Sequence, residues 1–390
     1  MISLTTYADA RDAYRHRDLR QALYDEGDAL MHGVIVNLHG AEHAARRRLE
    51  NRLFRRDTFA WFEAEVIPAV IAEMLTPALA AGRVDLLTLS RQTMINLSLR
   101  VAGVDRPLGT ADELDHLYSL MDRLARASTV ASATGDKAAI IDDGNSALDE
   151  LAEAFYAPSL ARRQALLSVG VEADYPADVL MTLVRNQDHL DLPADTLLRE
   201  IAYYPWVGSH STSNQFVHAM HHMFRWLDSC PGDRQRLTND ASWRQRFVHE
   251  SLRLHPASAV SLRRALADIT LKSGVEIGQG DTVAISLQDA NCDPLVFGPT
   301  AADFDPFRTL PDGVVAWGLS FGHGTHACLG TELAAGHDGE LLGAITVMAG
   351  AVLAAGARID PHDPPIIDDE TTRRVFGRYP VRLGAISTLY

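Results

Sequence analysis

Residues 320–330 read SFGHGTHACLG, a glycine-rich loop around a single cysteine, Cys328. Gly322 and Gly324 let the backbone turn tightly and approach a flat ligand closely, because glycine adopts dihedral angles that other residues avoid. The segment TELAAG after Gly330 predicts a helix that begins just behind the cysteine. N–H groups at a helix N-terminus stabilise a thiolate, so we expect the pKa of Cys328 to be lowered.

Two further side chains of this loop suit a bound group. Phe321 lies where it could shield the sulfur, and His326 lies where it could hydrogen-bond an anionic part of a ligand. Together these features predict a cysteine thiolate that binds a metal centre. For a lone cysteine the alternative is a small buried side chain in a glycine-rich turn, and the length of the whole pattern favours the metal centre.

Composition narrows the classes of protein to which the chain can belong. Its 390 residues are 47% hydrophobic, enough for a large core, and its formal net charge of -15 argues against a nucleic-acid partner. The three cysteines are widely spaced and do not form a disulfide framework, so we expect a reducing, cytoplasmic location. The most apolar tract, Leu341–Ala357, is too short to span a bilayer, which predicts a buried helix and turn and no membrane partner.

Helical periodicity dominates the chain. Residues 111–127, 145–156 and 241–254 carry apolar side chains at three- and four-residue steps. The clearest strand patterns are short and lie between residues 269 and 286, separated by glycine-bearing turns. The sequence therefore predicts a mostly α fold with a small β region, built as a single domain over residues 1–390.

Several stretches resemble one known family. FGHGTHACLG is similar to the haem-binding loop F-G-x-G-x-H-x-C-x-G of cytochrome P450 enzymes at every fixed position. Glu250 and Arg253 resemble the E-x-x-R pair of that family, and their spacing places both on one helix face. A third residue of this cluster is usually an arginine just before Phe-Asp; this chain has Asp303 there, and Arg308 is the candidate to replace it. ANCDPLVF, residues 290–297, resembles the stretch that precedes that position.

This resemblance implies a cytochrome P450-like domain that holds haem b, iron protoporphyrin IX, between helices I and L. Cys328 would be the axial iron ligand and hence the metal site. Arg263 in an R-x-A-x-x-D pattern, and His43 and Arg47 in GAEHAARRR, would contact the haem propionates. The first helix and first strands of the family fold would be absent or reduced. The residues that the resemblance assigns to the cofactor are His43, Arg47, Gly208, Arg263, Phe321, His326, Cys328 and Gly330.

Residues 192–216 resemble helix I of the family, whose usual signature is A-G-x-[DE]-T-T. In this alignment Gly208 takes the place of the glycine, His210 that of the acid and Ser211 that of the threonine. The acid and the alcohol deliver protons during oxygen activation, and a histidine titrates near neutral pH. Two alternatives stay open: His210 points elsewhere, or Thr212 supplies the hydroxyl.

The resemblance implies a haem-thiolate monooxygenase that hydroxylates, epoxidises or oxidatively couples a small organic substrate, free or carrier-bound, in a bacterial specialised-metabolite pathway. Electrons would come from a ferredoxin and a ferredoxin reductase. The run Arg46–Arg56, with six arginines, is either a solvated helix face or the docking surface for an acidic ferredoxin. The alternatives are peroxide-driven or substrate-assisted haem oxidation, and a non-catalytic P450-like partner protein.

Overall fold

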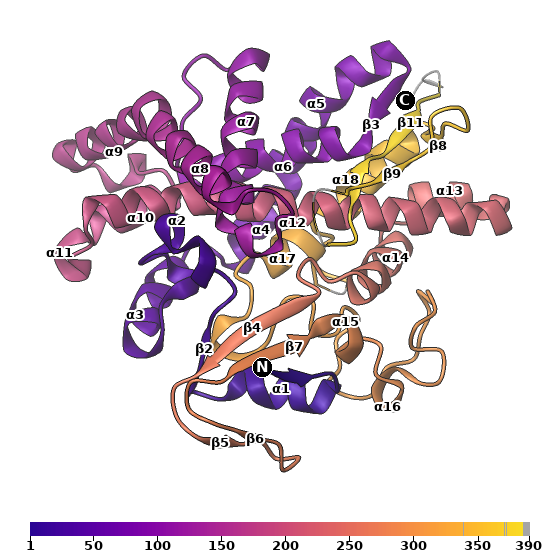
Figure 1. Ribbon diagram of the computed structural model, residues 1–390. Helices are drawn as coiled ribbons and strands as arrows, with labels where there is room; N and C mark the ends of the chain where they lie inside the picture. The colour runs from indigo at the N-terminus through magenta and orange to yellow at the C-terminus, as the bar shows by residue number, and fades with distance from the viewer. Residues whose placement is uncertain (338, 370, 372, 385–390) are drawn as a thin grey trace.

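Helices gather around one long central helix, α12 (Ala194–Ser229), which crosses the molecule from side to side (Figure 1). The structure is a computed structural model and describes residues 1–337, 339–369, 371 and 373–384. Helix α12 lies along α6 (Leu86–Ala102), which is buried on nearly every side. At their crossing, a Cβ on Gly208 would lie 2.7 Å from Ser98 Oγ, so the glycine allows the two helices to approach closely.

The predicted helices form where the periodicity placed them. Residues 241–254 form α14 (Ala241–Leu254), and residues 111–127 lie in α7 (Ala111–Ser128), whose first turn is capped by the hydroxyl of Thr110. The other α-helices, in chain order, are α1 (Tyr7–Arg15), α2 (Asp28–Met31), α3 (Gly40–Glu50), α4 (Arg56–Trp61), α5 (Ile67–Ala81), α8 (Lys137–Leu151), α9 (Ala157–Val169), α10 (Val179–Arg185), α11 (Gln187–Leu190), α13 (Arg234–Asn239), α15 (Leu287–Ala290), α16 (Pro294–Phe297), α17 (Thr331–Ala335) and α18 (Ala344–Ala354).

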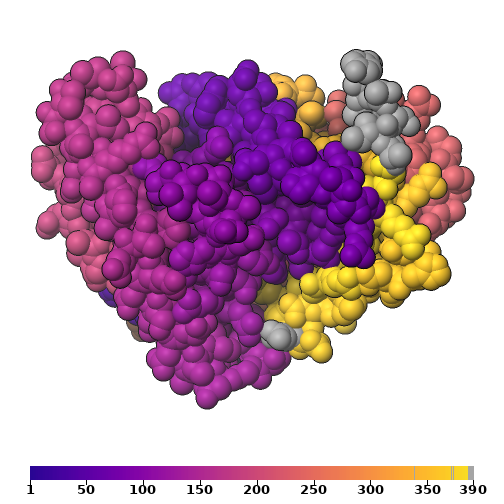
Figure 2. Space-filling model, turned by 90° about the horizontal axis from the view of Figure 1, so that it is seen from above, coloured from indigo at the N-terminus to yellow at the C-terminus, as the bar shows by residue number. Residues whose placement is uncertain are grey.

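Strands form small sheets at the edges of the helical body, which confirms the predicted mostly α fold with a small β region. A four-stranded sheet has the order β1 (Ile2–Leu4), β7 (Thr282–Ser286), β4 (Val260–Ala265), β2 (Leu19–Gln21). A three-stranded sheet has the order β3 (Arg83–Asp85), β11 (Pro380–Arg382), β8 (Arg358–Ile359). Two pairs complete the set: β5 (Ile269–Thr270) with β6 (Glu276–Ile277), and β9 (Ile366–Ile367) with β10 (Phe376–Arg378). Figure 2 shows the C-terminal segment against the purple residues near 80, where β11 pairs with β3.

The helix predicted behind the cysteine forms but is short. Helix α17 ends after five residues, and α18 starts only at Ala344. Gly336 and Gly343 have φ angles of +76° and +77°, and a Cβ on Gly336 would lie 2.2 Å from the carbonyl oxygen of Leu341. These glycines therefore let the chain fold back on itself between the two helices.

The basic run Arg46–Arg56 is not one solvated helix face, which corrects one of the two expectations for it. Helix α3 ends at Glu50 and α4 begins at Arg56. Arg46 is buried in an ion pair with Glu200, and its neighbour Arg47 lines an internal cavity. The exposed arginines of the run are Arg48, Arg52, Arg55 and Arg56.

One helical stretch, Arg56–Ala81, passes a test of length and apolar composition for crossing a bilayer. Its side chains Val66, Ile67 and Val70 are buried in the main hydrophobic cluster, together with residues of α6, α12 and α18. A core helix of a globular protein has the same composition, and this packing accounts for the apolar residues of the stretch.

Candidate active site

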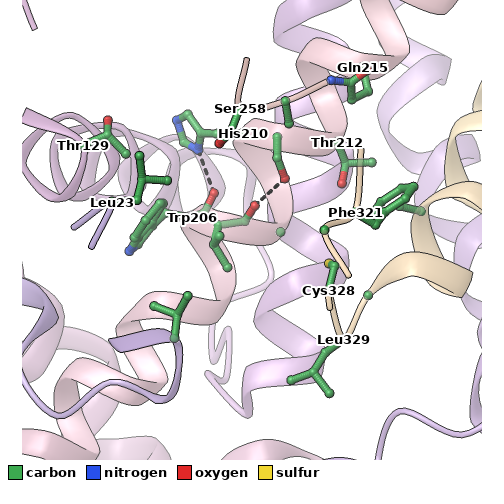
Figure 3. A pocket seen from close by; sticks show the side chains of 18 of the residues that line it. Leu23, Thr129, Trp206, His210, Thr212, Gln215, Ser258, Phe321, Cys328 and Leu329 are labelled. Atoms are coloured by element: carbon green, nitrogen blue, oxygen red, sulfur yellow. Dashed lines mark hydrogen bonds between the residues drawn. The ribbon is translucent and has the colours of Figure 1, made fainter. Parts of the chain in front are cut away.

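A cavity of about 530 Å³ lies between α12 and the loop that carries Cys328. Figure 3 shows Thr212 of α12 on the same side as Phe321 and Cys328, with His210 farther away beside Thr129. The volume is within the range of pockets that hold cofactors and small molecules. Apolar walls come from side chains on several elements: Met94, Leu252, Phe321, Leu329, Leu333 and Ile345.

The loop that carries the cysteine is held by the helices on either side of it. The backbone N–H of Cys328 donates to the carbonyl oxygen of Phe321 at 2.9 Å. Arg47 donates to the carbonyl oxygen of Ala327 at 2.6 Å, which ties the loop to α3. Gly324 has a φ angle of +73°, and a Cβ there would lie 2.7 Å from the carbonyl oxygen of Tyr14, so α1 packs directly on the glycine. The backbone thereby fixes where the sulfur points.

The pKa of Cys328 is raised, which corrects the lowering predicted from the sequence. Contacts with the N–H of Gly330 and the charge of Arg47 lower it, but burial of the thiol among the cavity walls raises it by more. Helix α17, five residues long, adds little dipole to oppose that burial. A thiolate at this depth needs a cation beside it, and a metal ion supplies one.

Four basic side chains converge on the cavity beside the cysteine: His43, Arg47, Arg263 and His326. The rings of His43 and His326 stack with their centroids 3.9 Å apart. Burial and neighbouring cations lower the pKa of His43 to about 4 and that of His326 to about 3. Burial also lowers the pKa of both arginines. Within the described part of the chain, no ion pair joins any of the four to a carboxylate.

These residues fit a haem. The four basic groups face one another without an acid between them, which is an arrangement that two propionates would neutralise. The thiol of Cys328 is accessible from the cavity and is the right ligand for the iron. Gly330 offers open space, since nothing lies within 4 Å of a Cβ built there. The ring of Phe321 packs edge-on against Trp317 at 5.8 Å and forms part of the wall near the sulfur.

The hydroxyls and the histidine of α12 differ in their surroundings. Ser211 Oγ donates to the carbonyl oxygen of Val207 at 2.6 Å, within its own helix. The Thr212 side chain is buried, faces the cavity and makes no side-chain hydrogen bond with the described residues. His210 Nδ1 lies 3.2 Å from the carbonyl oxygen of Trp206, and its Nε2 lies 3.3 Å from Asp122 Oδ1 of α7. No local pattern predicts this partner, which is 88 residues away along the chain.

The E-x-x-R pair forms a buried cluster below the cavity. Arg253, fully buried, donates to both carboxylate oxygens of Glu250, at 2.7 and 2.6 Å. The N–H of Asp305 donates to the same carboxylate at 3.0 Å, and Arg308 approaches it at 3.4 Å. Arg308 also donates to three backbone carbonyl oxygens of the neighbouring loop. Arg308 therefore occupies the place in the cluster that Asp303 does not fill.

A second buried acidic cluster joins α3 to α12, and the sequence analysis missed it. Glu200 accepts from Arg46 at 2.8 Å and from the N–H of Ile35 at 2.9 Å. The carboxylate of Glu50 accepts from the hydroxyl of Tyr204. Burial raises the pKa of Glu50 to about 7, and burial together with the charge of Glu50 raises that of Glu200. The sequence carries only a weak indication of this cluster: Glu200 is an acidic residue in the first half of α12, among many buried side chains.

Comparisons with known proteins agree with this site. The sequence profile of the family described as "Cytochrome P450" matches residues 234–339, which include the E-x-x-R pair and the cysteine loop. The chain is 35% identical over 171 residues to "Cytochrome P450 family protein EryCII" of Saccharopolyspora erythraea, covering 44% of this chain and 40% of the relative. It is 32% identical over 219 residues to "Cytochrome P450 BJ-3" of Bradyrhizobium diazoefficiens, covering 53% and 48%. The chain thus matches less than half the length of these curated relatives.

Solved structures extend the likeness to the whole fold. CalO2 has a TM-score of 0.78 at 21% identity, over 98% of this chain and 91% of that one. P450BioI, solved with a fatty-acid-ligated acyl carrier protein, has a TM-score of 0.76 at 18% identity, over 98% and 92%. The LnmA hydroxylase of the leinamycin pathway of Streptomyces atroolivaceus has a TM-score of 0.73 at 21% identity, over 97% and 89%. The loop, the buried cluster and the fold agree with the matched profile and relatives, which together support a bacterial-type cytochrome P450 and imply a haem cofactor.

Proposed function

We propose that the chain is a haem-thiolate monooxygenase with haem b in the cavity between α12 and the Cys328 loop. In that reaction one oxygen atom of O₂ enters the substrate and the other leaves as water, with two electrons and two protons consumed. The observation that carries the proposal is the thiol of Cys328 on the cavity wall beside four basic groups that form no ion pair with a carboxylate of the described residues. Cys328 would hold the iron, and His43, Arg47, Arg263 and His326 would hold the propionates.

The test of this proposal is the spectrum of the purified protein. We expect a haem protein whose ferrous carbon monoxide complex absorbs at the long wavelength typical of thiolate ligation. Cys328→Ala should lose that band, whereas Cys292→Ala, which changes a half-buried cysteine outside the cavity, should keep it. A band at the shorter wavelength of a neutral ligand in native protein, or a thiolate band that survives Cys328→Ala, would contradict the assignment.

Thr212 is our candidate for the hydroxyl that passes protons to the haem side of the cavity. Its hydroxyl faces the cavity, whereas that of Ser211 bonds to the carbonyl of Val207. Thr212→Val should therefore divert reducing equivalents to hydrogen peroxide and lower the product formed per NAD(P)H severalfold. Ser211→Ala is the matched control and should stay close to the native ratio. The opposite ranking would return the role to Ser211.

The electrons would come from NAD(P)H through a separate reductase and a ferredoxin, as bacterial members of the family generally use redox partners. The exposed arginines of the basic run, Arg48 and Arg52 among them, lie close in sequence to Arg47, which contacts the cysteine loop. An acidic ferredoxin would complement this surface. Reversing both charges should raise the ferredoxin concentration needed for half-maximal turnover, and the effect should fade at high salt.

We place the reaction in a specialised biosynthetic pathway, with a small organic substrate that is free or attached to a carrier. LnmA comes from such a pathway, and P450BioI was solved with a carrier protein. A peroxide-driven or substrate-assisted oxidation is the second candidate, because no acid stands on α12 at the position of His210. Turnover with hydrogen peroxide in place of the reductase system would distinguish it. A non-catalytic role is less well supported, since Cys328 and its loop are intact.

A further inference from the structure

The ring of His210 is held between two oxygen atoms. Its Nδ1 lies 3.2 Å from the carbonyl oxygen of Trp206, which can only accept a hydrogen bond. The nearby hydroxyl of Ser209 donates to the carbonyl of Pro205 at 2.6 Å, so its own proton is engaged there. Nε2 lies 3.3 Å from Asp122 Oδ1, a second acceptor when ionised. A neutral ring has a single N–H, so one of the two contacts lacks a proton unless the pair binds one more.

The groups around the pair decide where that additional proton resides. Asp122 lies in α7, and Arg91 of α6 approaches the same carboxylate oxygen at 3.5 Å. His210, Arg91 and Arg126 together lower the pKa of Asp122 despite its burial. Burial, the largest cause, and the charge of Arg91 lower the pKa of His210 below its ordinary value, and the contact with Asp122 offsets part of that lowering. Asp122 is therefore the ionised member of the pair, and the ring of His210 is the group that takes up and releases the proton.

All four of these groups border the cavity. Arg91, Asp122, Arg126 and His210 are all among its lining residues. Figure 3 shows His210 on the side of Thr129, away from Cys328. A proton on His210 is thus next to the space where a substrate would lie. Because α7 and α12 meet here, the carboxylate comes from a different helix than the one that carries the family's acid.

We propose that Asp122 is a positioning residue that supplies, from α7, the carboxylate missing from α12, and that it holds His210 as the proton donor of the cavity. This inference rests on the proposed monooxygenase function. Asp122 acts through His210: it fixes the orientation of the ring and keeps a second proton on it at higher pH than burial alone would allow. His210 then donates protons into the cavity that it lines.

The first test measures the titration of His210 directly. Holo protein, reduced and saturated with carbon monoxide to make the iron diamagnetic, is labelled with ¹³C-histidine and titrated by NMR, with His210→Gln to assign the signal. Asp122→Asn should lower the pKa of His210 by about one unit or more, and Asp122→Glu should restore most of the loss. Glu150→Gln is the matched control, because it removes the acid of another histidine–carboxylate pair, with His116 at 2.7 Å, outside the cavity.

The second test measures function across pH. Asp122→Asn should lower product formed per NAD(P)H severalfold and move the alkaline limb of the coupling profile to lower pH, in step with His210, while haem content stays native. An unchanged His210 pKa, or a shifted pKa with native coupling at every pH, overturns the proposal. Asp122→Ser serves as a second variant if Asp122→Asn does not fold. The absence of the thiolate spectrum in native protein would instead overturn the proposed function. The failure of the proposed function and the failure of the role proposed for Asp122 are therefore distinguishable.

Discussion

The fold contains two buried glutamate clusters, and they differ in how completely their charges are paired. In the cluster of Glu250, both carboxylate oxygens accept from Arg253, and further donors come from the backbone of Asp305 and from Arg308. In the cluster of Glu50 and Glu200, one oxygen of each carboxylate is buried without a hydrogen-bond partner among the described residues. The first cluster has two arginines for one acid, and the second has two acids around one buried arginine, Arg46.

Burial alone therefore does not fix the charge of a carboxylate. Taking an ion out of water costs several kcal/mol unless other charges and hydrogen bonds offset it, and a group that lacks them changes its protonation instead. Glu250 has hydrogen-bond donors at both carboxylate oxygens. Glu50 has a donor at only one, and its pKa rises to about 7. The same substitution, glutamate to glutamine, should therefore have opposite effects in the two clusters.

The largest effect is expected for Glu250→Gln. It removes the charge that Arg253 bonds at both oxygens and leaves that arginine buried and unpaired, which costs about 3–5 kcal/mol of folding free energy. Urea denaturation followed by circular dichroism measures the change, and haem content should fall with it. Glu150→Gln, in an exposed pair, is the control and should change stability by less than about 0.5 kcal/mol. A similarly small loss at Glu250 would mean that the cluster does not hold the fold together.

An effect of opposite sign and smaller size is expected for Glu50→Gln. The folded-state pKa of about 7 lies above the ordinary value of 4.5, so the folded protein binds more protons between these limits. The stability that this protonation contributes is therefore fully present below pH 4.5 and is lost as the pH rises through about 7. Glutamine mimics the protonated acid, so the variant should gain about 1–3 kcal/mol over native protein at pH near 8 and little at pH near 5. A loss of stability at the higher pH would show that Glu50 is an anion in the folded protein.

The two clusters also differ in how far the sequence predicted them. Glu250 and Arg253 are three residues apart and belong to a written pattern, and the Cys328 loop is a continuous string, so both could be found from sequence. Glu50 and Tyr204 are 154 residues apart, and so are Arg46 and Glu200. Contacts of this kind form only when α3 packs on α12, and no local spacing in the sequence predicts them.

The same reasoning explains the errors of the sequence analysis. Arg46 belongs to a charge run, and such runs are usually solvated, yet α3 turns its side chain inward against Glu200. The expected drop in the pKa of Cys328 took the helix N-terminus into account but not the burial of the thiol, which has the larger effect. His210 was placed on the correct helix by alignment, but its partner Asp122 lies on another one.

The smallest effect sharpens the assignment of the proton to Glu50. The hydroxyl of Tyr204 donates to that carboxylate and lowers its pKa, so Tyr204→Phe should raise the pKa of Glu50 further. A hydrogen bond to a charged group contributes about 2 kcal/mol and one to a neutral group about 1 kcal/mol. The variant should therefore lose more stability at pH near 8, where native Glu50 is ionised, than at pH near 6, where it is protonated.

In the Glu50→Gln background no ionisation remains, so Tyr204→Phe should cost the same at both pH values. Urea denaturation of the four proteins at the two pH values gives the coupling free energy directly. If the cost of Tyr204→Phe is independent of pH in the native background as well, Glu50 does not change its ionisation between these two pH values, and the assignment of the proton to Glu50 is wrong.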